Sequence, residues 1–402
     1  MRILHCTDTY PPQVNGVSVV TALAVDGLLA QGIEVGLIRP EYPACASSVF
    51  GEMRAPTAAC ALPACDFPAY PGVRLAWPNA GAVERFARAF APDLIHADTE
   101  FVVGRLGART ARRLGIPLVT SFHTDFAQYT ESYGVPWLRS TVTRSLVRFH
   151  RRARRIYTPS SVTADWLSRH GLTQSEVWGR AVDTRVFHPN RYSRTWRERL
   201  GVGDAVLFLH VGRLAAEKNV QLLLDGFALA RQALGDRACL VIAGDGPASA
   251  AMRGAAPAGV HFVGFIDRQR ELPSLYASAD AFLCASTTET LGLVILEAMA
   301  SGLPVAAVSA GGVADHLRSY DNGIAVAARA ESFAAAIIEL ADKPTLRARL
   351  GVGAREWAVA IGWDAELARL ADSYREVLDR NSTGNPDRPN DSRSTATRVA
   401  VS

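Results

Sequence analysis

The chain has 402 residues, of which 49% are apolar and 20% charged, and a formal net charge of +4. This length exceeds what one hydrophobic core usually serves, so we expect a soluble globular protein with two domains. The mild positive charge does not by itself indicate nucleic-acid binding, and no apolar run reaches the ~18 residues that span a bilayer.

The N-terminus, MRILHCTDTY, has one Arg and a short apolar run. It lacks the longer apolar core of a signal peptide, so we interpret it as a first strand and expect a cytoplasmic protein. The six cysteines form no C-x-x-C pair and no zinc-ligand spacing. Cys6, Cys239 and Cys284 lie in strand-like runs and are expected to be buried thiols.

Short apolar runs alternate with amphipathic stretches along the chain. Strands are predicted at 2–6, 33–38, 93–97, 117–122, 155–158, 206–211, 238–243, 260–263, 280–284, 304–308 and 324–327. Helices are predicted at 17–31, 104–114, 219–234, 292–301, 331–341 and 364–379. Alternating helices and continuously apolar strands are typical of α/β proteins, with parallel sheets covered on both faces.

A polar, turn-rich segment at 183–204 separates the strands into two sets. We therefore expect two Rossmann-like, doubly wound domains, 1–190 and 191–363, with helix 364–379 rejoining the first. Residues 381–402 have too few apolar side chains to pack, and we expect them to be disordered. Doubly wound sheets bind ligands beyond the carboxyl ends of their strands, so the expected site is a cleft between the domains.

The loop after the first strand reads PPQVNGVSVV, residues 11–20. Asn15 and Gly16 form a tight turn before a predicted helix. Glycine lets the backbone approach a ligand, and the N–H groups of a helix start favour anions. The alternative is a turn shaped only for packing.

The stretch RSTVTRSLVRFHRRARR, residues 139–155, contains seven Arg, and no acidic residue occurs from 132 to 164. Apolar residues recur at helical spacing: Leu138, Val142, Leu146 and Phe149. A basic amphipathic helix favours an anionic membrane surface. The arginines expected to meet it include Arg144, Arg148, Arg151 and Arg152.

Two alternatives for this stretch stay open. It is either a solvated helix that packs on its domain or a nucleic-acid patch. Sparse stacking aromatics and the modest net charge disfavour a nucleic-acid partner.

Arg213 and Lys218 follow the strand end at Gly212 in HVGRLAAEKN, before the next predicted helix. Two cations beside a helix N-terminus suit a diphosphate, because Arg can bind oxygens bidentately while Lys acts as a compact charge. The alternative is a solvated loop with surface charges.

Gly-rich turns follow the next two strands, as AGDGP at 243–247 and FVGFI at 262–266. Their glycines permit a close backbone approach, so these loops could form a nucleoside pocket. Turns also need glycine for their own geometry.

The stretch CASTTETLGLVILEAMASGLPVA, residues 284–306, contains Glu289 in a loop and Glu297 about one turn inside a helix. That helix is predicted to start near Gly292 and to end at Gly302. Free N–H groups at 291–294 can bind phosphate. Glu297 can accept hydrogen bonds from a vicinal diol and Glu289 from a sugar. The alternative is that both carboxylates are solvated.

As a set, these motifs resemble the retaining family 4 glycosyltransferases of the GT-B fold. The matching segments are the E-x7-E of ETLGLVILEAMASGLPV, Arg213-x4-Lys218, Asn15-Gly16, GRAVDTRVFHP at 179–189, GDGP, and AGG at 310–312. The resemblance covers roughly 1–378. Within that family, the overall pattern of the sequence is similar to lipid-directed GDP-mannose-dependent mannosyltransferases and to sulfoquinovosyl transferases.

The resemblance implies a donor site in the second domain. Arg213 and Lys218 would hold the diphosphate, Glu297 the ribose, and Glu289 hydroxyls of the transferred sugar. The amides of Leu291 and Gly292 would touch the distal phosphate.

Further roles follow from the same resemblance. The loop with Asn15 and Gly16 would approach the phosphates from the first domain. His123, in TSFHTDF, matches a His used near the sugar; its alternative is a hydrogen-bonded core His. Phe265 and Ile266 would contact the base through backbone groups.

The implied reaction is transfer of a hexose, mannose favoured, from GDP-mannose or a UDP-sugar to a membrane glycolipid or diacylglycerol-type acceptor, with retention. No Asp or Glu is clearly placed as a hydrolase-type nucleophile. The leaving phosphate would help to deprotonate the acceptor, while cations and helix amides stabilise the diphosphate. The chain has no Asp-x-Asp, so we expect no metal and no required cofactor; the nucleotide-sugar is a substrate.

Other classes of protein fit the sequence less well. A pyridoxal-type phosphorylase needs a cofactor lysine, and the chain has only Lys218 and Lys343. An N-acetylhexosamine epimerase is not indicated, because it lacks these paired motifs. A non-catalytic sugar-nucleotide-binding protein remains open. We expect a peripheral protein on the inner face of the cell membrane, and segment 44–72 matches no motif.

Overall fold

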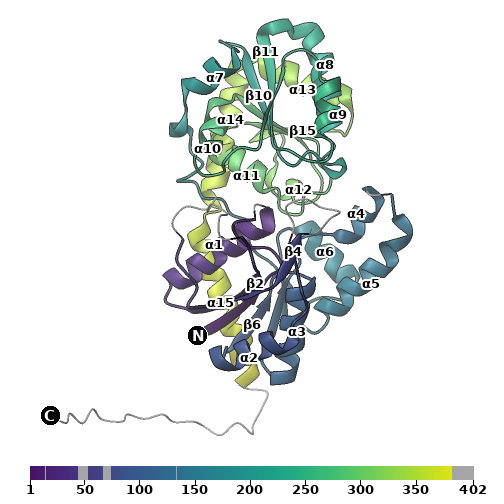
Figure 1. Cartoon of the computed structure of the whole chain (residues 1–402). Helices are drawn as coiled ribbons and strands as arrows, with labels where there is room; N and C mark the ends of the chain where they lie inside the picture. The colour runs from purple at the N-terminus through teal and green to yellow at the C-terminus, as the bar shows by residue number, and fades with distance from the viewer. Residues whose placement is uncertain (14, 44–52, 67–73, 133, 383–402) are drawn as a thin grey trace, which may run out of the picture.

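Two α/β units, one above the other, make up the protein (Figure 1). This computed structural model describes residues 1–13, 15–43, 53–66, 74–132 and 134–382. The chain builds the lower unit first, continues into the upper one, and returns to the lower unit with its last helix.

The lower unit contains a seven-stranded parallel sheet in the order β3-β2-β1-β6-β7-β8-β9. Its strands are β1 (Arg2–Cys6), β2 (Glu34–Pro40), β3 (Ala58–Leu62), β6 (Leu94–Ala97), β7 (Leu118–Ser121), β8 (Arg155–Thr158) and β9 (Ser175–Val177). Its helices are α1 (Gly16–Ala30), α2 (Ala80–Phe90), α3 (Val102–Leu114), α4 (Phe126–Ser132), α5 (Arg139–His150) and α6 (Ser161–Arg169). A separate antiparallel pair joins β4 (Ala64–Asp66) and β5 (Arg74–Ala76).

The upper unit contains a six-stranded parallel sheet in the order β12-β11-β10-β13-β14-β15. Its strands are β10 (Val206–Val211), β11 (Ala238–Ala243), β12 (Val260–Gly264), β13 (Ala281–Cys284), β14 (Val305–Val308) and β15 (Gly323–Val326). Its helices are α7 (Arg194–Leu200), α8 (Val220–Leu234), α9 (Ser249–Ala255), α10 (Leu272–Ser278), α11 (Leu293–Ala300), α12 (Val313–His316), α13 (Ala330–Asp342) and α14 (Pro344–Ala360).

The predicted fold class, two doubly wound parallel-sheet units, is confirmed. Each predicted strand is present, because parallel strands covered on both faces are continuously apolar; β11 is buried along its whole length. Cys6, Cys239 and Cys284 are buried, as expected. The sequence analysis missed the edge strands β3 and β9 and the pair β4 and β5; β9 has no apolar run, and the apolar run of β3 is rich in Ala and only partly buried.

The last helix, α15 (Trp363–Ser382), packs on the lower unit. Its Tyr374 hydroxyl lies 2.6 Å from Nδ1 of His96 on β6, and Arg155 of β8 donates to Ser373. Burial lowers the pKa of His96 to about 3, so this imidazole is neutral. The helix extends into the start of the segment expected to be disordered, and 383–402 lie outside the described residues.

No helix within the described part of the chain is long and apolar enough to cross a membrane. Part of segment 44–72 also lies outside the described residues, and its described part supplies β3 and β4.

The contact between Tyr374 and His96 predicts a measurable effect on stability. Tyr374→Phe leaves the Nδ1 of a fully buried imidazole without its partner, so the free energy of unfolding should fall by about 1–3 kcal/mol. Urea denaturation followed by circular dichroism measures it. Tyr192→Phe, at a residue 56% exposed, is the matched control. An equal, negligible effect of both changes would contradict the stabilising role of this contact.

Candidate active site

Two loops that carry predicted site residues touch where the two units meet. The hydroxyl of Thr290, in the loop after β13, donates to the carbonyl of His123, in the loop after β7, at 2.5 Å. A second contact joins Asp315 of α12 to the backbone N–H and side chain of Ser161 on α6. Strand-end loops of both sheets therefore face each other, as doubly wound sheets that share a ligand require.

Lys218 and Glu289 form a partly buried ion pair at the centre of this region. The ammonium Nζ lies 2.5 Å from Oε1 of Glu289, and the two side chains are 21% and 12% exposed. Burial by itself raises the pKa of Glu289. The Lys218 charge and hydrogen bonds from Lys218 and Ser286 outweigh that effect and hold the pKa below its usual value. Glu289 is therefore a carboxylate at neutral pH and accepts hydrogen bonds.

Arg213 is half-buried at the end of β10, and burial lowers the pKa of its guanidinium. The glycines of AGDGP have a structural task beside this loop. A Cβ on Gly244 would lie 1.9 Å from the carbonyl oxygen of Gly212, and one on Gly246 2.4 Å from that of Leu214. The close backbone approach is made to the chain itself, and it fixes the backbone that carries Arg213.

Two glycines of the AGG motif support the loop that carries Glu289. The N–H of Gly312 donates to the carbonyl of Glu289 at 2.6 Å, and a Cβ on Gly312 would lie 2.2 Å from the carbonyl oxygen of Thr290. A Cβ on Gly311 would meet the carbonyl oxygen of Glu289 at 2.3 Å. Only residues without a side chain fit beneath this loop.

The start of α11 lies in the same loop. Gly292 caps it with a φ of +77°, a left-handed conformation that favours glycine. Leu291 is 9% exposed, and its carbonyl accepts from Nε2 of His316 at 3.1 Å. Burial lowers the pKa of His316 to about 4, so a neutral imidazole holds this turn. Helix α11 thus directs its positive end toward the region of Lys218 and Glu289.

Glu297 lies one turn inside α11 and is only 2% exposed, so the alternative of a solvated carboxylate is wrong. Its Oε1 accepts from Nε of Arg268 at 3.0 Å and also from NH2 of that residue. Its Oε2 accepts from the hydroxyl of Tyr276 at 3.1 Å. The sequence did not reveal Arg268 or Tyr276, because these partners meet Glu297 only after the loop following β12 and α10 pack on α11.

The lower unit contributes His123, Asn15 and Gly16. His123 is half-buried, and burial lowers the pKa of its imidazole despite the opposing charges of Asp98 and Glu100. Asn15 accepts from the N–H of Ser18 and so caps α1. Gly16 is exposed, with nothing within 4 Å of a Cβ placed on it. The side chain of Asn15 therefore has a structural task, whereas the space at Gly16 is open.

Phe265 and Ile266 follow β12 in the upper unit. The ring of Phe265 is 63% exposed, and Ile266 is half-buried. The preceding Gly264 accepts from the N–H of Gly244 at 2.7 Å, which ties this loop to the one after β11.

Comparison with known proteins identifies the family. Residues 14–186 match the model "Glycosyltransferase Family 4", and residues 193–357 match "Glycosyl transferases group 1". A GDP-mannose-dependent alpha-mannosyltransferase of Mycobacterium tuberculosis (strain CDC 1551 / Oshkosh) is 31% identical over 393 residues, 95% of this chain and 98% of that protein. This chain belongs to the family 4 glycosyltransferases. The resemblance seen in the motifs is confirmed.

Two further similarities extend this result. An alpha-monoglucosyldiacylglycerol synthase of Streptococcus pneumoniae (strain ATCC BAA-255 / R6) is 31% identical over 321 residues, 76% of this chain and 71% of that protein. The crystal structure of HepE from Anabaena in complex with UDP has a TM-score of 0.74 at 20% identity, covering 94% of this chain and 100% of that one. The glycosyltransferase thus has the GT-B fold, and its nucleotide-sugar is a substrate and not a cofactor.

The basic stretch of the glycosyltransferase forms α5, which ends at His150, while Arg155 already belongs to β8. Its Leu146 and Phe149 are buried within the lower unit. The helix therefore packs on its domain, and its apolar face is not available to a membrane.

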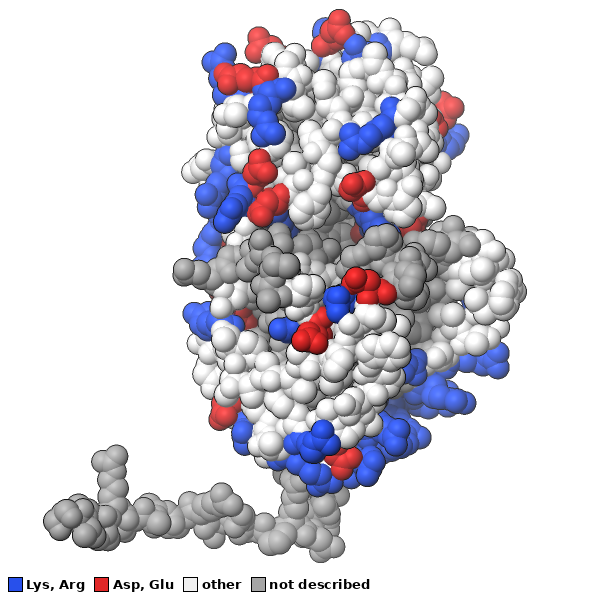
Figure 2. Space-filling view, viewed as in Figure 1, with Lys and Arg blue, Asp and Glu red and all other residues white. Residues whose placement is uncertain are grey.

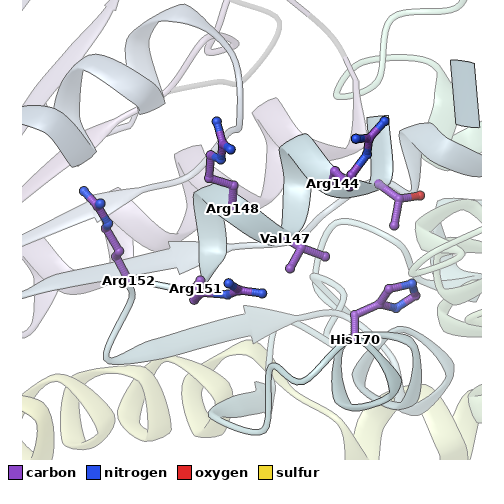
Figure 3. A pocket seen from close by; sticks show the side chains of 7 residues that line it. Arg144, Val147, Arg148, Arg151, Arg152 and His170 are labelled. Atoms are coloured by element: carbon purple, nitrogen blue, oxygen red, sulfur yellow. The ribbon is translucent and has the colours of Figure 1, made fainter. Parts of the chain in front are cut away.

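Exposed arginines lie on α5 and in the two residues that follow it. Arg144, Arg148, Arg151 and Arg152 are exposed and line a hollow with Thr143, Val147 and His170 (Figure 3). Basic side chains gather along the lower right of the lower unit, with few acidic ones between them (Figure 2). Trp137, just before α5, is 74% exposed.

One buried trio of the glycosyltransferase has side-chain types that bind metals. His5, His96 and Asp98 hold their ligand atoms within 4.8 Å of one another. Nδ1 of His5 lies 3.0 Å from Asp98, and Nε2 of His96 lies 2.7 Å from Ser121, so these atoms already have partners inside the lower unit, whereas the buried Nε2 of His5 has no hydrogen-bond partner among the described residues. The absence of a catalytic metal remains a prediction.

The support beneath Glu289 predicts that Gly312→Ala weakens nucleotide binding. The φ of Gly312 is −65°, so alanine adds no backbone strain, but its Cβ would displace the Thr290 carbonyl. We expect the affinity for a nucleoside diphosphate to fall about tenfold or more, since overpacking costs ~1–3 kcal/mol. Calorimetric titration measures it.

Gly254→Ala is the control for this change, because nothing lies within 4 Å of a Cβ on Gly254. Unchanged affinity in the folded Gly312→Ala variant would show that the loop tolerates displacement.

Proposed function

We propose that the protein is a retaining hexosyltransferase that moves a sugar, mannose favoured, from GDP-mannose or a UDP-sugar to a lipid acceptor. The observation that carries this proposal is the Lys218–Glu289 pair, which lies beside the start of α11 and one residue from the contact between the units. The names of the two curated relatives support the donor and the acceptor class.

We assign the donor side to 191–363 and the acceptor side to 1–190, with the helix at 364–379 packed on the latter. The two family models divide the chain in a compatible way, at 186 and 193. The cleft between the units then holds the reacting sugar.

The donor's leaving group would be stabilised by positive charge. Arg213 and Lys218 would contact the diphosphate, and the amides of Leu291 and Gly292 the distal phosphate. These groups supply the charge for which other transferases use a metal, which supports a metal-independent reaction. Because an ammonium has several N–H donors, Lys218 can bind phosphate while it keeps Glu289 in place.

Glu289 would orient the sugar and would not attack it. Its carboxylate is ionised and paired with Lys218, so it is suited to accept hydrogen bonds from sugar hydroxyls. His123, neutral and half-buried, would contact the sugar from the lower unit.

Retention would follow from same-face displacement. The bond between the anomeric carbon and the phosphate oxygen breaks as the acceptor oxygen bonds to that carbon. The proton of the acceptor hydroxyl passes to the departing phosphate oxygen. Positive charge at Arg213 and Lys218 lowers the cost of the charge that develops on the diphosphate.

Nucleotide binding would also use Gly16, Glu297 and the loop with Phe265 and Ile266. Glu297 would bind the ribose, and the loop would contact the base through its backbone. The open space at Gly16 supports a close approach of the first loop, including Asn15, to the phosphates.

The acceptor would lie in a membrane. The exposed arginines on α5 and just after it, and the exposed Trp137, support a peripheral position on the inner, cytoplasmic face of the cell membrane. Since the apolar face of α5 is buried, binding would be mainly electrostatic.

A second candidate uses a UDP-sugar, with sulfoquinovosyl or glucosyl transfer to diacylglycerol or to a soluble acceptor. The similarity to an alpha-monoglucosyldiacylglycerol synthase supports this second candidate. The third candidate is a non-catalytic sugar-nucleotide-binding protein, which differs from the other two because it would bind the donor without releasing the nucleotide. Nucleotide release from GDP-, UDP- and ADP-sugars, with extracted membrane lipids as acceptor, decides among them. Binding without release in every combination would overturn the transferase.

Substitutions in the donor site should reduce transfer strongly. We expect Lys218→Ala and Glu289→Gln each to lower kcat about 10²–10³-fold, as loss of a transition-state contact does. Lys343→Ala, at the other lysine of the chain, is the control, because that side chain is exposed and paired with Glu339. Near-normal transfer by a folded Lys218→Ala variant would rule out its contact with the diphosphate.

Membrane binding should depend on the positive charge of α5 and the two arginines that follow it. We expect simultaneous Arg→Glu changes at Arg144, Arg148, Arg151 and Arg152 to abolish sedimentation with anionic phosphatidylglycerol vesicles at low salt. The control reverses an equal number of exposed arginines elsewhere: Arg191, Arg194, Arg270 and Arg349. Equal loss in both variants would mean that only net charge matters, and α5 would not be the membrane surface.

A further inference from the structure

The partners of Glu297 connect two parts of the nucleoside site. Arg268 belongs to the loop after β12, two residues beyond Ile266, and reaches across to Glu297 on α11. Tyr276 comes from α10 and is fully buried, while the side chain of Arg268 is 13% exposed. One carboxylate is therefore held by a guanidinium from one segment and a phenol from another.

The hydrogen bonds on Glu297 are unevenly divided between its oxygens. A carboxylate oxygen accepts about two hydrogen bonds. Oε1 already accepts from both Nε and NH2 of Arg268, so its capacity is used. Oε2 accepts from Tyr276 and has room for about one more donor.

A vicinal diol presents two hydroxyls, and Glu297 in this arrangement can accept from one of them. The guanidinium of Arg268 has further N–H donors besides the two directed at Oε1. The second hydroxyl of the diol has no free acceptor on Glu297. A hydroxyl can also accept a hydrogen bond, so this second hydroxyl can accept one from an N–H of Arg268.

Arg268 is fixed in this position by packing. Its guanidinium lies over the ring of Phe187, 5.0 Å from the ring centroid, and Phe187 packs edge-on against Tyr276. The carboxylate of Asp267 accepts from the N–H groups of Gln269 and Arg270, which orders the loop. The pair of Arg268 and Glu297 is thus set before a nucleotide binds.

We propose that Glu297 and Arg268 bind the ribose diol jointly. One hydroxyl donates to Oε2 of Glu297, and the adjacent hydroxyl accepts from an N–H of Arg268. This inference rests on the proposed function, because it takes Glu297 as the ribose-binding residue. A buried ion pair stabilises a fold no better than packed apolar residues do, which agrees with a role in ligand binding.

The alternative is that Arg268 and the ribose compete for Glu297. If the ribose needed both oxygens of Glu297, Arg268 would compete with it, and removing Arg268 would strengthen nucleotide binding. The two relations predict affinity changes of opposite sign.

The test measures dissociation constants by calorimetry for GDP, UDP and the 2′-deoxy and 3′-deoxy forms of whichever binds. In the unaltered protein we expect each missing hydroxyl to weaken binding about tenfold, the ratio typical of one charge-assisted hydrogen bond. In Arg268→Ala the complete nucleotide should bind about tenfold more weakly. To this variant, one of the two deoxy nucleotides should bind as tightly as the complete nucleotide does, because the hydroxyl that it lacks no longer has its partner. A merely structural role would leave both penalties intact.

Two other variants sharpen the comparison. Arg270→Ala, at an exposed arginine of the same loop, should keep both hydroxyl penalties. Arg268→Lys, which keeps a charged donor, should bind the nucleotide with intermediate affinity. If Arg268→Ala does not fold, Arg268→Lys provides the test. Lysine has fewer N–H donors than arginine, so removal of one of the two ribose hydroxyls should weaken binding to this variant less than it weakens binding to the unaltered protein.

The outcomes are distinct. Unchanged penalties in the Arg268 variants, or tighter nucleotide binding by Arg268→Ala, overturn joint binding and leave the proposed function intact. If neither GDP nor UDP binds to the unaltered protein, the proposed function fails and this inference fails with it.

Discussion

Two acidic side chains, one just before α11 and one inside it, can be taken out of water only because each contacts a cation. Glu289 meets Lys218, and Glu297 meets Arg268. An isolated buried charge would be too costly, so the segments that carry these cations must return to the same place in the fold. Lys218 follows β10, Arg268 follows β12 and Glu289 follows β13, so the strands of the upper sheet bring the partners together at their carboxyl ends.

Glycine makes the required approach possible. The loops after β10 and β11 touch backbone to backbone at Gly244 and Gly246, and the loop at 310–312 lies directly beneath Glu289. Such contacts exclude any side chain. The loops that carry Arg213 and Glu289 are therefore held by close backbone contacts, whereas the space around Gly16 of the lower unit is open.

The contact between Thr290 and His123 brings the two units into one site. Thr290 is next to Glu289 in sequence, so the loop that carries Glu289 contacts the lower unit directly. The last helix reinforces the lower unit through Tyr374 and Ser373, away from these loops. The contacts of the last helix and those of the loops between the units thus form separate sets.

The sequence by itself determined the family 4 glycosyltransferase fold and most of its strands, because buried parallel strands are continuously apolar and several weak motifs occur in one order. It also placed Glu297 inside a helix, since the Gly292 and Gly302 boundaries can be recognised locally. Only the tertiary structure decided which groups meet Glu297, that Leu146 and Phe149 of α5 face inward, and that the GDGP glycines approach the chain itself. These facts depend on contacts between residues far apart in the chain, which no local spacing encodes.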